Sequence, residues 1–403
     1  MKAVIFTLGC KVNEVESASV MSALESLGWQ TDNVLGYADA YVLNTCAVTR
    51  EAEKKSRQLI ARARKFNPNA KIFVCGCASE KDRKSFEEKG VTFVTGARRK
   101  EEVITAFTKI YGGKDCGLLC PKQVRTRAFI KIQDGCNNFC SYCVIPYLRG
   151  REVSRPEEDI LKEISMTDSP EIVLNGINIS SYNGGNLVPL MEKLKGVQKR
   201  IRLGSLECNV ITESFLTALK GLYDFAPQFH LSLQSGSDGV LKAMNRHYTR
   251  AQYLEKCNLI YAHFPQAAIT TDIIAGFPTE TEEDFLDSLK IIGEARFARV
   301  HAFPFSPREG TVAYKLKDIP PNVKSERLNR LLKAAKLSEN KFLHGFLNTE
   351  HTIIAEDYEE GFTCGYTGNY IRVYVSDKLQ TGKKYKVILK EIFKDGVIGE
   401  INE

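Results

Sequence analysis

Three closely spaced cysteines are the strongest candidate for chemistry in this sequence of 403 residues. Cys136, Cys140 and Cys143 have the spacing C-x3-C-x2-C. Thiolates in such a group suit a soft metal centre, and an iron–sulfur cluster normally takes four of them. With three protein ligands, one iron keeps an open coordination position, which a reactive metal site needs. The motif therefore predicts an iron–sulfur cluster that binds a further ligand at its open iron.

A structural zinc site is the alternative interpretation of this motif. Such a site needs a fourth ligand close by, usually from a second pair of Cys or His residues. The sequence has no histidine before His230, and no cysteine follows Cys143 until Cys208. The missing ligand favours the iron–sulfur cluster.

The elements before Cys136 place three further cysteines at one edge of a sheet. Apolar runs predict strands at Lys2–Leu8, Ala40–Asn44, Lys71–Cys75 and Val91–Thr95, with amphipathic helices between them. Alternating strands and helices predict a parallel sheet, in which ligands bind beyond the carboxyl ends of the strands. The cysteines that directly follow the first three strands are Cys10, Cys46 and Cys77. We expect them to form a second metal-binding group.

Two features of the other cysteines limit this prediction. Buried cysteines also serve as small apolar residues, so the three positions could be structural. Cys75 competes with Cys77, but it lies inside an apolar strand, whereas Cys77 follows Gly76, where the backbone can turn toward a ligand. Cys116 and Cys120 lie in a linker, and we treat them as incidental.

The middle of the chain repeats a strand-then-helix unit about six times, which predicts an open, partial (β/α) barrel. The strands are expected at Ala128–Gln133, Glu171–Leu174, Ile201–Leu203, Phe229–Leu233, Ala268–Ile274 and Arg299–Phe303. Barrel enzymes place their chemistry at the carboxyl ends of the strands. The C-x3-C-x2-C motif follows the first of these strands and is in that position.

The last part of the chain loses the helical period, and short glycine-bounded strands predict a small β-barrel. Tyr366, Tyr370, Arg372 and Tyr374 could form a face that stacks on bases and contacts phosphates, or they could be ordinary strand residues. We therefore predict three domains: two α/β domains at residues 1–115 and 116–343, and a β domain at residues 344–403.

Composition limits the class of protein. The net charge is +7, which permits a nucleic-acid partner without requiring one; the three domains carry +5, +5 and −3. Twelve cysteines in a chain of this length are too sparse for a disulfide scaffold and favour metal binding in a reducing compartment. No apolar run reaches membrane-spanning length, and the start is too short for a signal segment. We expect a cytoplasmic protein that does not bind a membrane.

The motifs, taken in order, resemble those of the radical S-adenosylmethionine (SAM) methylthiotransferases, and the resemblance covers nearly the whole chain. An aromatic residue, here Tyr142, precedes the last cysteine of the three-cysteine loop, as it does in radical SAM enzymes. The matching stretches are LGCKVN (8–13), NTCAV (44–48), CGCA (75–78), KIQDGC (131–136), IPYLRGR (145–151), LQSGS (233–237), GFPTET (276–281) and SPREGT (306–311).

The resemblance implies two 4Fe–4S clusters and SAM as cofactors. Cys136, Cys140 and Cys143 would hold the cluster whose open iron chelates SAM, the source of a 5′-deoxyadenosyl radical. Cys10, Cys46 and Cys77 would hold a second cluster that presents the sulfur of the product. One SAM would methylate this sulfur and another would supply the radical. The family adds a C-terminal RNA-binding domain, called TRAM, at 344–403.

The residues around the first cysteine separate the branches of this family. Lys11 and Val12 are typical of the branch that modifies C2 of N6-threonylcarbamoyladenosine at tRNA position 37. A Gln-Met pair is typical of the branch that acts on isopentenyladenosine, and a Pro-Lys pair of the branch that acts on a ribosomal-protein aspartate. We therefore expect the tRNA anticodon loop as substrate, and the other two branches are the alternatives.

Residues at the predicted strand ends are candidates for the remaining contacts. For SAM these are Tyr142, Asn175, Gly176, Glu207, Gln234, Ser235 and Asp272, of which Asp272 could instead be a core carboxylate. For the tRNA phosphates they are Arg149, Arg151 and Arg308, each of which could instead form a structural ion pair. We expect a monomer that takes electrons from a separate donor. A tRNA-binding scaffold with structural clusters is the alternative from another class, and cleavage of SAM would distinguish the two.

Overall fold

The computed structural model describes residues 1–121 and 126–402, which form two compact units. The first unit contains the N-terminal part up to residue 121, and two later segments return to it, Asp134–Val153 and Arg308–Tyr314. The second unit contains residues 126–133, Ser154–Pro307 and the chain from Lys315 onward. The loop with the C-x3-C-x2-C motif therefore packs with the N-terminal part of the chain.

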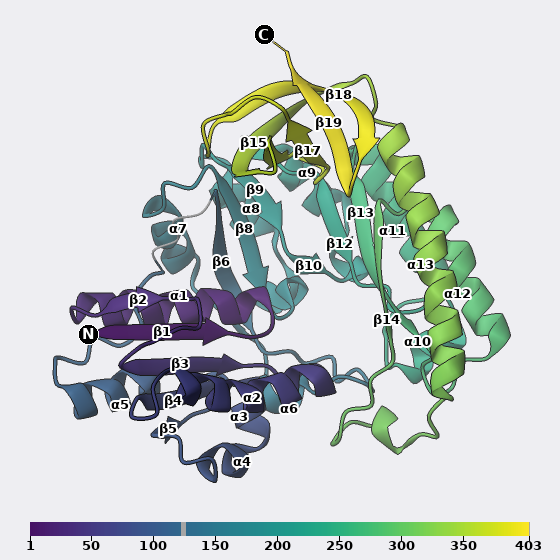
Figure 1. The fold of residues 1–403 in the computed structure, drawn as a ribbon. Coiled ribbons are helices and arrows are strands. Elements are labelled where there is room, and N and C mark those ends of the chain that lie inside the picture. The colour runs from purple at the N-terminus through teal and green to yellow at the C-terminus, as the bar shows by residue number, and fades with distance from the viewer. Residues whose placement is uncertain (122–125, 403) are drawn as a thin grey trace. The chain divides into compact units, whose positions relative to one another are not determined.

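The first unit is built on a five-stranded parallel sheet in the order β2-β1-β3-β4-β5 (Figure 1). Its strands are β1 (Lys2–Thr7), β2 (Gln30–Asp32), β3 (Ala40–Thr45), β4 (Lys71–Gly76) and β5 (Phe93–Val94). β1, β3 and β4 are adjacent, so their carboxyl ends lie next to one another. This order brings the three predicted cysteine positions to one edge of the sheet.

Helices cover both faces of this sheet. One apolar core joins the sheet to α1 (Lys11–Ser26) and α5 (Glu101–Tyr111), and another joins it to α2 (Arg50–Phe66) and α4 (Arg83–Glu87). α3 (Cys77–Lys81) and α6 (Ile145–Arg149) pack with the second core. Thr49 starts α2, because its hydroxyl accepts a hydrogen bond from the Ala52 amide at 3.1 Å.

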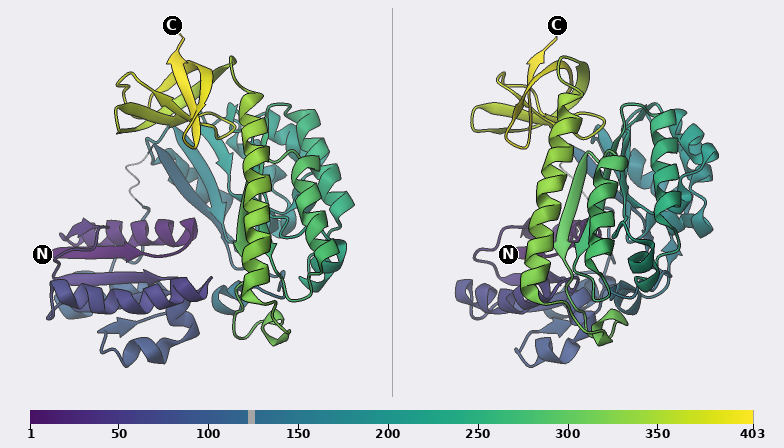
Figure 2. Two further views of the ribbon diagram at one scale, coloured as in Figure 1. Left: turned by 45° about the vertical axis from the view of Figure 1, so that its right-hand side comes forward. Right: turned by 90° about the vertical axis from the view of Figure 1, so that its right-hand side faces the viewer.

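The second unit contains two curved sheets that form an open half-barrel (Figure 2). One has the order β11-β9-β8-β6-β7 and the other the order β10-β12-β13-β14. The strands are β6 (Arg127–Asp134), β7 (Val153–Ser154), β8 (Glu171–Gly176), β9 (Arg200–Leu203), β10 (Ser205–Leu206), β11 (Asp224–Phe225), β12 (Gln228–Leu231), β13 (Ala268–Ala275) and β14 (Arg299–Pro304). The paired strands are parallel where helices connect them, which confirms the predicted fold class.

Helices pack on the outer face of the half-barrel around one large apolar core. They are α7 (Glu157–Ser165), α8 (Val188–Leu194), α9 (Glu213–Lys220), α10 (Asp238–Ala243), α11 (Arg250–His263), α12 (Glu282–Glu294) and α13 (Pro321–His344). Capping boxes at Thr249 and Thr281 fix the starts of α11 and α12. The long helix α13 runs beside β14, as both views in Figure 2 show.

A closed five-stranded barrel follows α13 within the second unit, in the order β15-β16-β17-β19-β18. Its strands are β15 (Glu350–Glu359), β16 (Phe362–Tyr366), β17 (Arg372–Val375), β18 (Lys384–Phe393) and β19 (Gly396–Ile401). An apolar core fills its interior. The sequence predicted this barrel from its short glycine-bounded strands.

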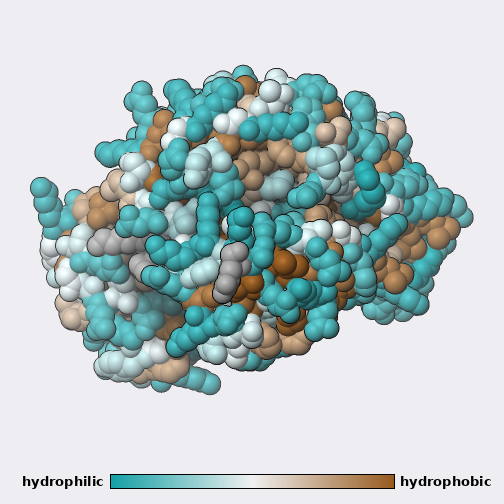
Figure 3. Space-filling view, turned by 90° about the horizontal axis from the view of Figure 1, so that it is seen from above, coloured by the Kyte–Doolittle hydropathy of each residue, from teal (hydrophilic) through white to brown (hydrophobic). Residues whose placement is uncertain are grey.

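The face shown in Figure 3 is mainly hydrophilic, with groups of hydrophobic residues between the hydrophilic ones. None of the helices in the described parts of the chain combines the length and the apolar character needed to cross a bilayer.

Candidate functional site

The three N-terminal cysteines lie at the carboxyl ends of adjacent strands, as predicted. Cys10 precedes α1 after β1, Cys46 follows β3, and Cys77 begins α3 directly after β4. Gly9 has a φ of +115°, and a Cβ there would lie 3.1 Å from the Cys46 sulfur. The tight approach of the first loop to the second cysteine therefore requires glycine at this position.

The thiols of this group are close enough to influence one another. Burial raises the pKa of the Cys46 thiol, and the neighbouring Cys77 and Cys10 raise it further. Cys46 and Cys77 are buried, whereas Cys10 is exposed. Repulsion among three thiolates is relieved when they share a cation, so this donor set favours a thiophilic metal.

Cys75 and Cys77 belong to different faces of the sheet. Cys75 packs in the core beneath α1 and α5, and burial raises the pKa of its thiol to about 11. Cys77 packs in the core on the other face. Between them, Gly76 has a φ of +106°, and a Cβ there would meet the Thr45 carbonyl oxygen at 2.4 Å. The glycine turns the chain so that only Cys77 reaches the edge of the sheet, which supports the choice of Cys77 over Cys75.

The C-x3-C-x2-C loop is held by backbone hydrogen bonds within the first unit. The Cys136 amide donates to the Gly150 carbonyl at 3.2 Å, and the Cys143 amide to that of Cys140 at 2.9 Å. Phe139 has a φ of +47°, and the Arg151 guanidinium lies 4.7 Å from the centroid of its ring. Tyr142, at the turn before Cys143, is half-buried. The loop is thus ordered by its own contacts and by the segment that follows it.

No three Cys, His, Asp or Glu side chains in residues 1–121 and 126–402 are arranged to enclose a metal ion as they stand. The donor chemistry nevertheless fits iron–sulfur clusters, because each group offers three thiols on loops at a sheet edge and neither offers an imidazole. The cluster residues remain a prediction.

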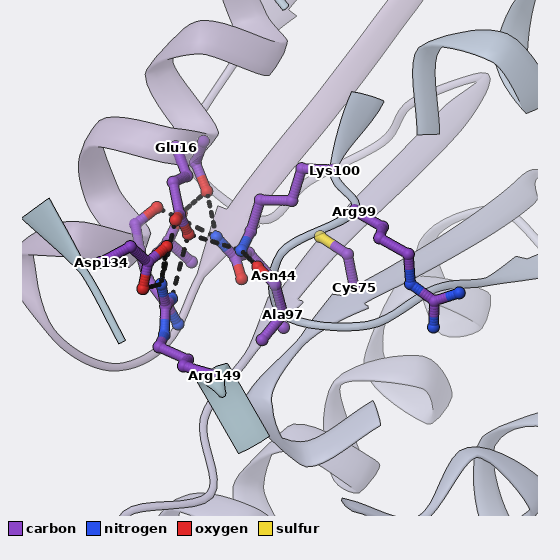
Figure 4. A network of polar contacts seen from close by, with 12 residues as sticks. Glu16, Asn44, Cys75, Ala97, Arg99, Lys100, Asp134 and Arg149 are labelled. Atoms are coloured by element: carbon purple, nitrogen blue, oxygen red, sulfur yellow. Dashed lines mark hydrogen bonds and ion pairs between the residues drawn. The ribbon is translucent and has the colours of Figure 1, made fainter. Parts of the chain in front are cut away.

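Arg149 was expected to contact a tRNA phosphate, and the structure contradicts this expectation. Its side chain has no exposed surface, and its Nη1 lies 3.0 Å from both Glu16 and Asp134 (Figure 4). Its Nη2 also donates to Asn13 Oδ1 at 2.6 Å. Lys100 pairs with Glu16 in the same network. Pro146 and Leu148 of α6 are buried next to Arg149, and the arginine belongs to a buried structural network.

Arg308 departs from the prediction in the same way, whereas Arg151 does not. Arg308 is 3% exposed and donates to Glu53 at 2.6 Å. Burial raises the pKa of Glu53, but the hydrogen bond from Arg308 and the charges of Lys81 and Arg308 outweigh it and leave the pKa below its usual value. Arg151 is exposed, and its contact with a phosphate remains a prediction.

Asn175, Gly176 and Glu207 of the second unit lie at strand ends, as expected, whereas Asp272 lies inside β13. Asn175 and Gly176 close β8, and the buried Asn175 Nδ2 has no hydrogen-bond partner. A Cβ at Gly176 would lie 3.0 Å from the Gln133 carbonyl oxygen, which is a tight contact that favours glycine. Glu207 follows β10 and pairs with Arg246 at 3.0 Å. Asn175 has a donor available for a ligand, whereas the Glu207 carboxylate is shared with an arginine.

Gln234 and Ser235 follow β12, and both are buried. Gln234 has a φ of +73°, and its amide donates to the Asp272 carbonyl at 2.8 Å. Ser235 has no exposed surface, and its hydroxyl lies 3.3 Å from Ser288 Oγ. The predicted contact between Ser235 and SAM is therefore wrong for the side chain, which instead holds the loop against α12.

The structure adds a histidine pair that the sequence analysis did not single out. His230 Nε2 lies 3.2 Å from Asp272 Oδ2, and the rings of His230 and His301 are 5.9 Å apart. His230 alternates with the core residues Phe229 and Leu231, so it lies on the face of β12 opposite the apolar core. The sequence signal that could have identified His230 is the polar residue at every second position of this strand. Asp272 is thus paired and partly exposed, rather than a core carboxylate.

Comparisons with known proteins agree with this architecture. Residues 2–96 match the family described as Uncharacterized protein family UPF0004, and residues 130–292 match the Radical SAM superfamily. Among solved structures, a radical SAM methyltransferase, TsrM from Kitasatospora setae, with bound cobalamin and a 4Fe–4S cluster, superposes with a TM-score of 0.56. It shares 12% identity, and the match covers 75% of this chain and 74% of that chain. This likeness supports the fold.

Curated relatives match over nearly the whole length. The threonylcarbamoyladenosine tRNA methylthiotransferase MtaB of Chlamydia pneumoniae is 36% identical over 98% of this chain and 96% of its own. The Bacillus subtilis (strain 168) MtaB is 35% identical over 95% of this chain and 93% of its own. A tRNA-2-methylthio-N(6)-dimethylallyladenosine synthase from Thermosipho africanus is 33% identical over 100% and 99%. With its radical SAM half-barrel and these relatives, the chain belongs to the radical SAM tRNA methylthiotransferases of the MtaB-like type.

Proposed function

We propose that this enzyme converts N6-threonylcarbamoyladenosine at tRNA position 37 to its 2-methylthio derivative, with two 4Fe–4S clusters. Residues 1–115 would serve as the domain of the second cluster, 116–343 as the radical SAM core and 344–403 as the TRAM-like RNA-binding domain. The observation that carries the substrate is the full-length similarity to MtaB proteins of several bacteria. Lys11 and Val12 beside Cys10 support the same branch.

The first cluster and SAM would together supply the 5′-deoxyadenosyl radical that activates C2 of the adenine. Cys136, Cys140 and Cys143 would hold this cluster. Asn175 would donate a hydrogen bond to the bound SAM. The SAM would lie close to the backbone at Gly176 and Gln234. Asp272, oriented by His230, and Glu207 would accept hydrogen bonds from SAM hydroxyl or amino groups, and Tyr142 would flank its adenine.

The second group of cysteines would present the sulfur that enters the product. Cys10, Cys46 and Cys77 would hold the second cluster, while a second SAM provides the methyl group. The enzyme would act as a cytoplasmic monomer that takes electrons from a separate donor. Arg151 would contact the anticodon loop.

Nucleoside mass spectrometry of tRNA from a deletion strain tests the substrate. We expect loss of the 2-methylthio derivative of threonylcarbamoyladenosine. Threonylcarbamoyladenosine without the methylthio group should accumulate. The wild-type gene should restore the product. A variant with Cys136, Cys140 and Cys143 all changed to Ala should not restore it, and it should form no 5′-deoxyadenosine from SAM in vitro.

The relative that acts on dimethylallyladenosine defines the second candidate. Loss of the methylthio derivative of isopentenyladenosine in the deletion strain, with threonylcarbamoyladenosine products unchanged, would replace the proposed substrate with that one.

A further inference from the structure

The short helix α6 presents a large aromatic ring to solvent directly after the C-x3-C-x2-C loop. Pro146, Leu148 and Arg149 of this helix are buried, whereas Tyr147 is 55% exposed. A single exposed aromatic residue is common on protein surfaces and by itself indicates no function. The neighbours of Tyr147 therefore decide whether its ring has a role.

A second aromatic residue and an arginine lie beside Tyr147. The rings of Phe139 and Tyr147 meet edge to face, with their centroids 5.6 Å apart. The Arg151 guanidinium lies 4.7 Å from the centroid of the Phe139 ring. Phe139 has a φ of +47°, which costs free energy for a bulky residue, and such strain is concentrated at functional sites. An edge-to-face contact leaves at least one face of each ring uncovered, so the exposed Tyr147 ring can accept a further stacking partner.

Two guanidinium groups at these rings have no acidic partner. Arg98 Nη2 donates a hydrogen bond to the Arg151 carbonyl oxygen, and both arginines are exposed. Neither of them forms an ion pair with a residue of the described ranges 1–121 and 126–402. We call Arg98, Phe139, Tyr147 and Arg151 the aromatic–cationic patch. It combines two rings with two cations that are available to an anionic ligand.

The aromatic–cationic patch is part of the loop that carries the C-x3-C-x2-C motif. Phe139 lies between Cys136 and Cys140 in the sequence. The Cys136 amide donates to the carbonyl of Gly150, directly before Arg151, at 3.2 Å. All four residues of the patch belong to the first unit. A nucleotide bound to the patch would therefore lie close to the site where the radical is expected to form.

Rings and cations of this kind suit single-stranded RNA, whose bases stack on aromatic side chains and whose phosphates bind arginine. A base that leaves the stack for chemistry also leaves its neighbours without a stacking partner, which an aromatic ring can replace. We propose that Tyr147 stacks on a nucleotide next to the modified adenosine, with Phe139 supporting its ring. Arg98 and Arg151 contact the adjoining phosphates. This inference rests on the proposed tRNA substrate.

Binding of a fluorescent anticodon stem-loop that contains threonylcarbamoyladenosine tests the patch. Anisotropy titrations use the full chain after anaerobic reconstitution. Loss of stacking on one base should weaken binding by roughly 5- to 150-fold in Tyr147→Ala and in Tyr147→Leu. Tyr147→Phe should bind as tightly as wild type, because it keeps the ring.

Tyr37→Ala is the matched control. Tyr37 is 64% exposed in the same unit, and its ring has no aromatic or cationic side chain beside it in the described parts of the chain. This variant should bind the stem-loop as tightly as wild type. Circular dichroism of each variant checks that the fold is retained, and the comparison of Tyr147→Leu with Tyr147→Phe decides the outcome where Tyr147→Ala unfolds.

Two further measurements separate stacking from electrostatic and structural effects. The slope of log affinity against log salt should not change in Tyr147→Leu, because stacking releases no counterions, and it should fall by about 1 in Arg98→Ala. An abasic nucleotide on the 5′ or the 3′ side of the modified adenosine removes one neighbouring base. At one of these two positions, Tyr147→Leu should cause no loss beyond that caused by the abasic nucleotide.

The outcomes separate this inference from the proposed function. Equal affinity of wild type and Tyr147→Leu would overturn the inference, and so would additive losses at both abasic positions. A wild-type protein that does not bind the stem-loop would overturn the proposed tRNA substrate, and the inference with it.

Discussion

At the scale of single residues, the two cysteines on either side of Gly76 offer a direct test of the sulfur-donating site. Cys77→Ala should abolish methylthiolation of tRNA but leave cleavage of SAM to 5′-deoxyadenosine, because the radical site has its own cysteines. Cys75→Ala should keep both activities and cost about 1 kcal/mol of stability, since it removes one buried thiol from the core beneath α1 and α5. Mass spectrometry of both products, together with thermal unfolding, measures these effects. Normal methylthiolation by Cys77→Ala would show that the wrong cysteine was assigned.

Glu53 links the stability of the first unit to pH. Its pKa lies below the usual 4.5, since Arg308 and Lys81 outweigh the effect of burial. The lowered pKa contributes stability above pH 4.5 that is lost as the pH falls through the folded-state pKa. We expect the free energy of unfolding of wild type to decrease below about pH 4.5 more steeply than that of Glu53→Gln. Chemical denaturation at pH 3–7 measures both slopes, and equal slopes would contradict the assigned role.

At the scale of elements, the strands that the sequence predicted are those with continuous apolar runs. β1, β3 and β4 are buried on both faces, so their composition alone identified them. β2 escaped prediction because Gln30–Asp32 is a short edge strand without an apolar residue. The burial of Arg149 could not be inferred either, because its partner Glu16 lies 133 positions away in the sequence.

The sequence left open whether the tyrosines and Arg372 of the C-terminal barrel form a base-stacking face or are ordinary strand residues. The structure favours the second interpretation, because these side chains have partners within the protein. The rings of Tyr366 and Tyr370 stack at 4.6 Å, and the guanidinium groups of Arg127 and Arg202 lie 4.7 Å from Tyr366 and Tyr370, respectively. Arg372 and Tyr374 both bind Asp395. The two stacked tyrosines thus fasten the barrel to β6 and β9 of the same unit, whereas Arg372 and Tyr374 are held by Asp395 within the barrel.

Tyr370→Ala tests this role of the barrel. It removes the stack on Tyr366 and the contacts with Arg202 and Arg127, whose guanidinium groups lie 4.7 and 5.3 Å from the Tyr370 ring. It should therefore lower the free energy of unfolding by roughly 1–2 kcal/mol. Tyr358→Ala is the control, because Tyr358 is 52% exposed on the same barrel. Urea denaturation followed by circular dichroism compares the two variants. Equal stability would show that the aromatic stack does not fasten the barrel.

Truncation before His344 should accordingly destabilise the half-barrel in addition to weakening tRNA binding.

At the scale of the whole molecule, charge decides where the tRNA backbone can bind. Residues 1–343 carry a net charge of +10, and the terminal segment carries −3, which together give the +7 of the chain. This distribution was evident from the sequence, but the arginines that can reach RNA were not, since burial removes Arg149 and Arg308 from the accessible set. Of the three predicted phosphate contacts, Arg151 is the one that remains exposed.

Arg151→Ala therefore tests the electrostatic contribution to tRNA binding. If its guanidinium neutralises one phosphate, the variant should bind tRNA more weakly at low salt, and the slope of log affinity against log salt should fall by about 1. Lys84→Ala is the control, because Lys84 is an 85% exposed cation of the same unit. Anisotropy titrations from about 50 to 200 mM salt give both slopes. A slope that changes equally in the two variants would mean that Arg151 contributes only to the general positive field, and the phosphate contact would have to come from another residue of the first 343.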